Sequence, residues 1–185
     1  FAPNEERGIF KTEDGGNTWK KIHFISNKTG ARDIEINPTN SNEILASFWT
    51  VQRKPWTLID GSDEGGVFIS KDGGKNWKKL SEGLPKGLIG KIEVEYSPVN
   101  SNRLWAMIQA QKEEEGGLYR SDDGGKAWKK VNSDHKLRQR GWYYSHITAD
   151  PKNENIIYAS NTGFYKSIDG GDRKSTRLNS SHQII

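Results

Sequence analysis

The sequence predicts an all-β fold, a fragment of a β-propeller, and three observations support this prediction. A glycine-rich turn motif recurs four times along the 185 residues. Between consecutive copies lies a second repeated unit, in which two apolar runs flank a turn rich in proline and asparagine. Together the two units give four short antiparallel strands per repeat of roughly fifty residues, which is typical of a propeller blade.

The turn motif places an aspartate and two glycines between two apolar runs, as in the segment from Ser121 to Trp128. Glycine adopts the positive φ angles of a tight hairpin turn without strain. The aspartate, and a hydroxyl group two residues before it, can accept hydrogen bonds from nearby backbone N–H groups. We therefore interpret the aspartates and tryptophans of the motif as structural turn residues, not as catalysts or calcium ligands. They are Asp14, Trp19, Asp72, Trp77, Asp123, Trp128 and Asp169.

The second repeated unit reads as strand, turn, strand, with its turns at Pro38, Pro98 and Pro151. Proline and asparagine at these turns separate runs that favour β-strands. Even small propellers need about four blades to close, so we expect the rest of the propeller to be missing at both ends. The expected units are a half blade at 1–22, complete four-stranded blades at 32–81 and 90–132, and a partial blade at 145–171.

Residues 172–185 differ in character from the repeats before them. The string from Asp172 to His182 resembles a sequencing adapter translated in frame, so we expect 172–185 to be an artefactual or disordered tail. A natural polar tail is the alternative. Without the three basic residues and one acidic residue of this tail, the net charge falls from +4 to +2. A nearly balanced chain gives no indication of a nucleic-acid partner.

Composition and motifs exclude several kinds of site. The chain contains no cysteine and its histidines are scattered, so neither a disulfide framework nor a metal site is expected. The glycine-rich stretch 83–91 lacks the spacing of a phosphate-binding loop, and we expect no cofactor. No apolar run is long enough to span a membrane, and no direct membrane contact is expected in this segment. The paired lysines after each complete turn motif are interpreted as protection of an exposed sheet edge.

The spacing of the two repeated units locates the expected binding face. From a motif aspartate to the next turn proline the distances are 24, 26 and 28 residues, whereas from that proline to the following aspartate they are 34, 25 and 18. The variable segment is the loop between the second and third strands of a blade. This loop and the links between blades share the face opposite the turn motifs, and variable loops on a rigid scaffold commonly carry binding residues.

Aromatic and arginine side chains collect in these loops and links. Such side chains suit a carbohydrate ring, a peptide anchor or an anionic group, because each offers a large contact at low entropic cost. For Trp56 and Trp142 the alternative is packing between blades, whereas Trp105 and the tryptophans of the turn motifs are expected to pack. The candidate ligand-binding residues are Arg53, Trp56, Asp60, Arg138, Arg140, Trp142 and Tyr143.

The turn motif resembles the Asp-box, or bacterial neuraminidase repeat, with the pattern Ser/Thr-x-Asp-x-Gly-x-x-Trp. Beyond the box, residues 7–171 are similar to the sortilin amino-terminal propeller and its bacterial-type relatives, in segments such as 53–56, 83–85 and 137–140. The resemblance implies a ligand-binding propeller that recognises a carbohydrate or peptide, in a secreted or extracytoplasmic protein. The absence of cysteine departs from true sortilins.

The alternative is a fragment of a glycoside hydrolase, sialidase-like or xyloglucanase-like, with its catalytic residues largely outside this piece. A glycosidase needs two carboxylates about 5 to 10 Å apart. Asp60, Asp63, Glu64 and the run 113–115 lie in loops of the expected binding face, but nothing in the sequence pairs them. The arginine triad of sialidases is not recognisable. Catalytic residues are therefore left unassigned, and the sequence leaves enzymatic activity open.

Overall fold

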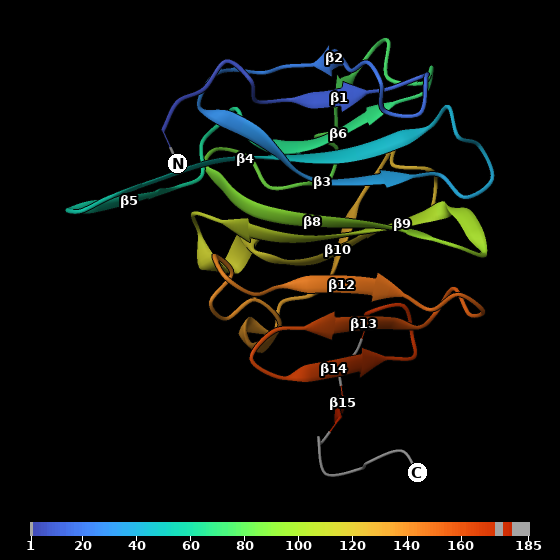
Figure 1. Ribbon diagram of the computed structural model, residues 1–185. Helices are drawn as coiled ribbons and strands as arrows, with labels where there is room; N and C mark the ends of the chain where they lie inside the picture. Colours follow the sequence, from blue (N-terminus) through green and yellow to red (C-terminus); the bar gives the residue numbers. More distant parts are fainter. Residues whose placement is uncertain (1, 173–175, 179–185) are drawn as a thin grey trace, which may run out of the picture.

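The computed structural model describes residues 2–172 and 176–178, which form antiparallel sheets that follow one another along the chain (Figure 1). We number these sheets as blades 1 to 4. No helix within the described residues is long and apolar enough to cross a membrane. The two short 3-10 helices are η1 (Glu113–Glu115) and η2 (His135–Leu137).

Each complete blade is a meander of strands in sequence order, with the predicted order of turns. Blade 1 contains β1 (Ile9–Lys11) and β2 (Lys20–His23), and blade 2 contains β3 (Thr29–Ile36), β4 (Ile44–Lys54), β6 (Gly66–Ser70) and β7 (Lys78–Lys79). Blade 3 contains β8 (Ile89–Ser97), β9 (Asn100–Ala110), β10 (Gly117–Ser121) and β11 (Lys129–Asn132). Blade 4 contains β12 (His146–Ala149), β13 (Ile157–Ser160), β14 (Phe164–Ser167) and β15 (Thr176–Leu178).

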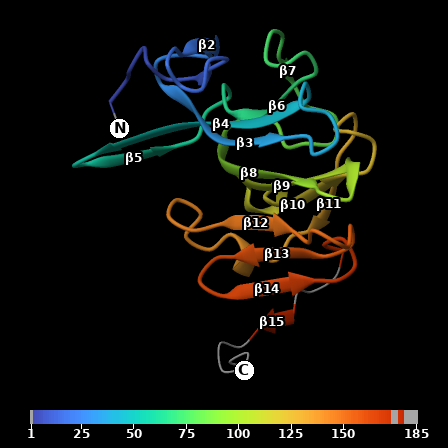
Figure 2. The same ribbon diagram turned by 45° about the vertical axis from the view of Figure 1, so that its right-hand side comes forward.

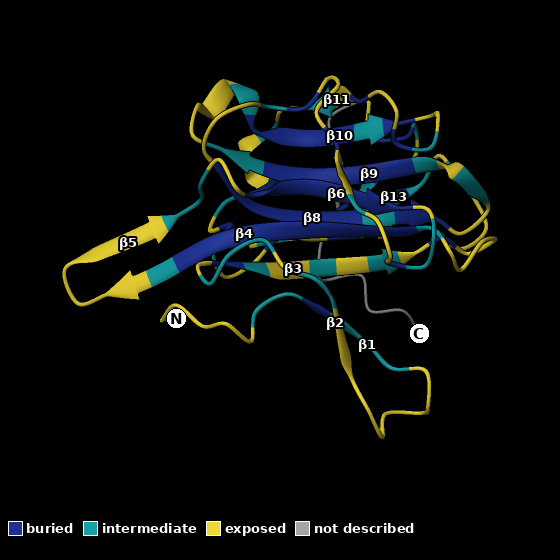
Figure 3. Cartoon of the chain, turned by 90° about the horizontal axis from the view of Figure 1, so that it is seen from above, coloured by how far each residue is buried: buried dark blue, intermediate teal, exposed yellow. Residues whose placement is uncertain are grey.

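The first strands of blades 2, 3 and 4 lie side by side, and the later strands of each blade extend away from them (Figures 1 and 2). This is the arrangement of a β-propeller fragment, and the predicted fold class is confirmed. Residues that alternate along one strand contact opposite neighbours. In β9, for example, Leu104 packs in the apolar cluster between blades 2 and 3, whereas Trp105 packs in the cluster between blades 3 and 4. The strands in the middle of the stack are therefore buried on both faces (Figure 3).

Blade 4 has a fourth strand where the sequence predicts a partial blade that ends at residue 171. The backbone of β15 pairs with β14 in the register of an antiparallel ladder. Without this pairing β14 would present unpaired N–H and C=O groups, to which main-chain groups of any sequence can bind. Residues 173–175 and 179–185 lie outside the described residues, so the artefactual origin of the tail stays a prediction.

The box turns are held by short-range hydrogen bonds. In blade 2, Ser70 Oγ accepts the N–H of Gly74 at 2.9 Å and donates to Asp72 at 2.9 Å. Asp72 also accepts the N–H of Asn76 at 2.9 Å, and Trp77 Nε1 donates to Gly74 O at 3.0 Å. The boxes of blades 1 and 3 repeat these four contacts. These four contacts all lie within the eight residues of the motif.

Each complete blade joins its box to its own proline/asparagine turn through one backbone hydrogen bond. The donor is the N–H of the first glycine of the box, and the acceptor is an asparagine carbonyl group. Because this bond joins the two turns at one edge of the blade, it fixes the box relative to the first two strands. The pairs are Gly73 with Asn42 at 2.9 Å, Gly124 with Asn102 at 2.9 Å, and Gly170 with Asn155 at 2.7 Å.

We expect the carboxyl group of Asp72 to titrate near pH 2 in the folded protein. Hydrogen bonds from the backbone and then the side chain of Asn76 lower its pKa to about 2. The folded state therefore gains stability from the ionised Asp72 above about pH 4, and loses it as the pH falls through that lowered pKa. An NMR titration is the measurement, and Asn76→Ala is expected to raise the midpoint. An ordinary Asp72 midpoint in the native protein would contradict the bonded turn.

The box tryptophans pack against the last strand of the preceding blade. Trp77 stacks on His23 of β2 with ring centroids 5.0 Å apart. Trp128 is buried in the same cluster as Leu80, which follows β7. Trp19 differs from the expected packing role, because its side chain is 61% exposed. Within the described residues no strand precedes blade 1, so nothing covers this ring, although its Nε1 still donates to Gly16 O.

The lysine pairs lie on the outermost strands, as the edge interpretation expects, and the second lysine of each pair also binds the chain. Its Nζ donates to a main-chain carbonyl group 16 residues earlier, just before the third strand of the same blade. Each contact ties the outer edge to the loop that leads into that strand. The pairs are Lys21 with Glu5, Lys79 with Asp63, and Lys130 with Glu114.

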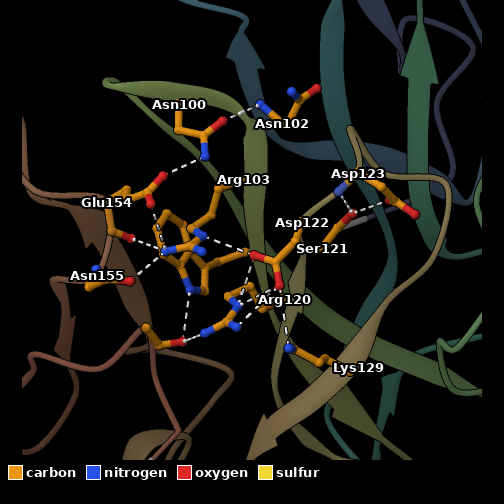
Figure 4. Close-up of polar contacts among 12 residues, drawn as sticks. Asn100, Asn102, Arg103, Arg120, Ser121, Asp122, Asp123, Lys129, Glu154 and Asn155 are labelled. Carbon is orange, nitrogen blue, oxygen red and sulfur yellow. Dashed lines mark hydrogen bonds and ion pairs between the residues drawn. The ribbon is translucent and has the colours of Figure 1, made fainter.

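Ion pairs join blades 3 and 4 on the box side (Figure 4). Arg103 contacts Asp122 at 2.9 Å and Glu154, in the turn of blade 4, at 3.7 Å. Arg120 contacts Asp122 at 3.1 Å and donates to Gly170 O at 3.0 Å. Burial acts to raise the pKa of Asp122, but bonds from Arg120 and Arg103 outweigh it and lower that pKa. This edge of the fragment is therefore occupied by structural contacts.

Candidate ligand-binding rim

The candidate site lies at the edge of the blades opposite the box turns, which we call the rim. It is formed by the β4–β5 hairpin and the link from β11 to β12 (Figures 1 and 2). The sequence predicts a loop after the second strand of blade 2, but β4 continues to Lys54 and β5 (Thr57–Asp60) pairs with it through a turn at Pro55 and Trp56. The hairpin extends away from the blades and its outer part is exposed (Figure 3).

Asp60 is held at the base of this hairpin. Its Oδ1 accepts a hydrogen bond from Nε1 of Trp49 at 2.9 Å, and its Oδ2 accepts one from Nε2 of Gln109 at 3.0 Å. Trp49 belongs to β4 and is only 8% exposed, and Gln109 belongs to β9 of the next blade. Asp60 therefore ties blade 2 to blade 3 at the rim.

The link from β11 to β12 supplies the other side of the rim. Trp142 packs edge-on against Trp49, with ring centroids 5.1 Å apart. Next to it Tyr143 is exposed, and its hydroxyl group accepts a hydrogen bond from Arg53 at 3.2 Å. Lys91 Nζ donates to the carbonyl groups of Tyr144 and Ser145, which holds the end of this link on β8. Four of the seven candidates, Arg53, Asp60, Trp142 and Tyr143, are thus brought together.

The other three candidates take different positions. Trp56 is at the hairpin turn and is 78% exposed, so it does not pack between blades. Arg138 is 8% exposed and forms an ion pair with Glu113 at 2.8 Å, so its charge is used inside the protein. Arg140 is exposed and has a positive φ of 53°. Its carbonyl group accepts the N–H groups of Tyr143 and Tyr144, which gives Arg140 a turn-forming role in the link.

Two acidic residues near the rim, Glu64 and Glu113, are held in the ionised form by hydrogen bonds. Ser26 donates to Glu64 at 2.6 Å, and this bond and a second one from Thr29 lower the pKa of Glu64. Arg138 and then His135 likewise lower the pKa of Glu113, against the effect of burial. A general acid for glycoside cleavage needs a raised pKa, so neither carboxyl group fits that role. Within the described residues no group of histidine, aspartate and glutamate side chains could hold a metal ion.

Sequence reasoning missed two carboxyl groups on the first strands of blades 2 and 3. Burial raises the pKa of Glu35, and it raises the pKa of Glu95 to about 7. Glu95 Oε1 accepts the N–H of Ala149 at 3.0 Å, which links β8 to β12. The sequence held a signal for these two residues, because each glutamate lies at the same place in the repeat, three residues before the turn proline.

Comparisons with known proteins agree with this architecture. The BNR/Asp-box repeat matches residues 68–79. The chain is a β-propeller fragment that contains a BNR/Asp-box repeat. A xyloglucanase from Paenibacillus sp is 29% identical over 161 residues, which cover 80% of this chain and 14% of that protein. The chain therefore spans a small part of the curated relative that it matches.

Solved structures share the fold of this propeller fragment. The GH74 xyloglucanase from Xanthomonas campestris has a TM-score of 0.65 at 19% identity, covering 92% of this chain and 25% of that one. A structure of YCF48 bound to D1 peptide has a TM-score of 0.52 at 16% identity, covering 81% of this chain and 40% of that one. At these identities, the two solved structures show the fold that this chain shares with them.

Proposed function

We propose that this Asp-box propeller segment contacts a polysaccharide of the xyloglucan class through its rim, as part of a larger glycan-acting protein. The observation that carries the proposal is the exposed aromatic surface of the rim. Trp56 and Tyr143 are 78% and 62% exposed, and Arg53 lies beside Tyr143. A flat aromatic ring with a neighbouring polar group offers an apolar face and hydrogen bonds to the same ligand.

Two further points support this proposal. The base of the β4–β5 hairpin is held in place, since Trp49 is buried and contacts both Asp60 and Trp142. Rigid anchors bind with less loss of conformational entropy than mobile ones. The curated relative is a xyloglucanase, and this chain covers only 14% of its length. In the proposal, the carboxylates that cleave the polysaccharide belong to other parts of the whole protein.

The proposal predicts that xyloglucan oligosaccharides bind to the protein and that the rim aromatic residues contribute to affinity. Trp56→Ala and Tyr143→Ala are each expected to raise the dissociation constant about tenfold, as for an exposed anchor residue. Isothermal titration calorimetry measures this change. Trp19→Ala is the matched control, because Trp19 is 61% exposed in a box turn, on the edge away from the rim. Equal affinities for all three variants and the wild type would rule the rim out as the binding surface.

A peptide is the second candidate ligand for the same rim. YCF48, which shares this fold, has been solved with a bound peptide. Arg53 next to exposed aromatic rings also suits a peptide with an acidic and an apolar side chain. Binding of such a peptide, with no binding of xyloglucan oligosaccharides and with the same loss in Trp56→Ala, would favour this candidate over the first.

A further inference from the structure

A small cavity lies below the rim, where the link from β11 to β12 crosses blade 3. Its volume is about 10 Å³, and its lining includes Lys91, Gln109, Arg138, Gly141 and Ser145. This volume is close to the space that one enclosed water molecule needs. Gln109 lines the cavity and also bonds to Asp60, so one side chain connects the cavity to the base of the β4–β5 hairpin.

Two buried polar atoms of the lining residues have no hydrogen-bond partner among the described residues. They are Oε1 of Gln109 and Nε of Arg138. The orientation of the Gln109 amide is fixed by chemistry, because the carboxylate of Asp60 can only accept and therefore faces the amide nitrogen. The amide oxygen must then point away from Asp60. Burial of such a group without a partner costs free energy, and native proteins satisfy nearly all of these groups.

Gly141 also lines the cavity and lies next to this amide oxygen. A Cβ atom added to Gly141 would lie 2.9 Å from Gln109 Oε1 and 3.4 Å from the carbonyl oxygen of Arg138. Two acceptors therefore lie beside Gly141, and a methyl group at this position would crowd Gln109 Oε1. A group that satisfies Oε1 must donate a hydrogen bond. Gly141 does not have a left-handed φ, so the backbone itself would tolerate alanine there.

We propose that this cavity binds one ordered water molecule, which donates to Gln109 Oε1 and accepts from Arg138 Nε. Water has both capacities and the required size. A chloride ion has no proton to donate to Gln109. A metal cation would meet the cationic side chains of Lys91 and Arg138, and Glu93, the carboxylate in the lining, is already paired with Lys91 at 3.1 Å.

The water site extends a chain of contacts to the surface. Gln109 binds Asp60, Asp60 binds Trp49, and Trp49 packs on Trp142. By holding the amide of Gln109 in one orientation, the water keeps a donor directed at Asp60. Gln109 is thus a positioning residue for the rim. This last consequence rests on the proposed function, whereas the water site itself does not.

A high-resolution crystal structure of the protein tests the site directly. The expected result is a single density peak within hydrogen-bonding distance of both Gln109 Oε1 and Arg138 Nε. A cavity without density at that resolution would overturn the proposal. So would an anomalous signal in crystals soaked in bromide, because it would identify the occupant as an anion.

Gly141→Ala is expected to abolish this peak, since its methyl group occupies the position beside Gln109 Oε1. Loss of the bridging bonds is expected to raise the equilibrium constant for unfolding about tenfold in chemical denaturation. Gly163→Ala is the matched control: its Cβ would lie 3.0 Å from the hydroxyl oxygen of Tyr165, also without a left-handed φ, in another loop. The control is expected to keep the peak. An unchanged peak in Gly141→Ala would overturn the proposal.

Gln109→Met removes the acceptor itself and covers the case in which Gly141→Ala does not fold. A folded Gln109→Met protein that still shows the peak would contradict the assigned bond. The density test can succeed while xyloglucan binding fails, and the reverse can also occur, so the water site and the proposed function are tested separately. If both hold, Gly141→Ala is also expected to weaken oligosaccharide binding, whereas Gly163→Ala is not.

Discussion

Replacing Glu93 by leucine is expected to lower the free energy of unfolding by about 3–5 kcal/mol, the cost of leaving a buried charge without its partner. Glu93 and Lys91 are only 2% and 5% exposed, and their charged atoms are 3.1 Å apart. Burial lowers the pKa of Lys91, and the negative charge of Glu93 is the largest effect that raises it. Without Glu93, the ammonium group keeps only two carbonyl acceptors.

Urea denaturation measures this loss, and a double variant separates charge from packing. Lys91→Met combined with Glu93→Leu is expected to recover most of the stability, because no buried charge then lacks a partner. Arg32 also pairs with Glu93, but Arg32 is exposed and water can solvate its charge. Glu114→Gln is the control for the loss of a carboxylate, since Glu114 is exposed. A double variant that is no more stable than Glu93→Leu would show that the ion pair is not the cause.

Trp105→Ala is expected to cost about 3–5 kcal/mol of the free energy of unfolding, as for other large-to-small changes in a core. Trp105 is fully buried between blades 3 and 4, in a cluster with Ile147 and Leu118. Its Nε1 donates to Gly170 O at 3.4 Å. Truncation therefore leaves a cavity at the blade interface and removes a hydrogen bond.

The control for Trp105→Ala is Trp19→Ala, because Trp19 is 61% exposed. Its substitution is expected to change the free energy of unfolding by no more than about 0.5 kcal/mol, as for most surface positions. Chemical denaturation of both variants gives the comparison. Similar losses for the two would contradict the burial difference between these tryptophans.

The parts of the fold that depend on near neighbours in the sequence were predictable. Asp72 accepts hydrogen bonds from Ser70 and Asn76, and Trp77 donates to Gly74 O, all within one turn. The motif therefore carries its own structure. The four-strand repeat follows, since turn residues and apolar runs set the strand order. The β4–β5 hairpin was not predicted, although Thr57–Asp60 follows its turn with residues that favour strands.

The candidate rim was predictable only in part, because its contacts join distant parts of the chain. Spacing placed Arg53 and Tyr143 on the same edge, but their hydrogen bond depends on how the blades pack. The sequence did not indicate that Arg138 would be buried against Glu113. The exposure of a side chain also depends on the neighbouring blade. Trp19 and Trp128 occupy the same position of the motif, but Trp19 is exposed and Trp128 is buried.

The self-sufficient hydrogen bonding of the boxes has a consequence for loop exchange. Each box of blades 2, 3 and 4 bonds within itself and to one asparagine carbonyl group of its own blade, and none of these bonds involves the rim. Exchanging the β4–β5 hairpin for the shorter segment that precedes β10 would therefore leave the turns at the other edge intact. Ligand preference could then diverge between related proteins through insertion and deletion at one edge, while the turns at the other edge keep their hydrogen bonds.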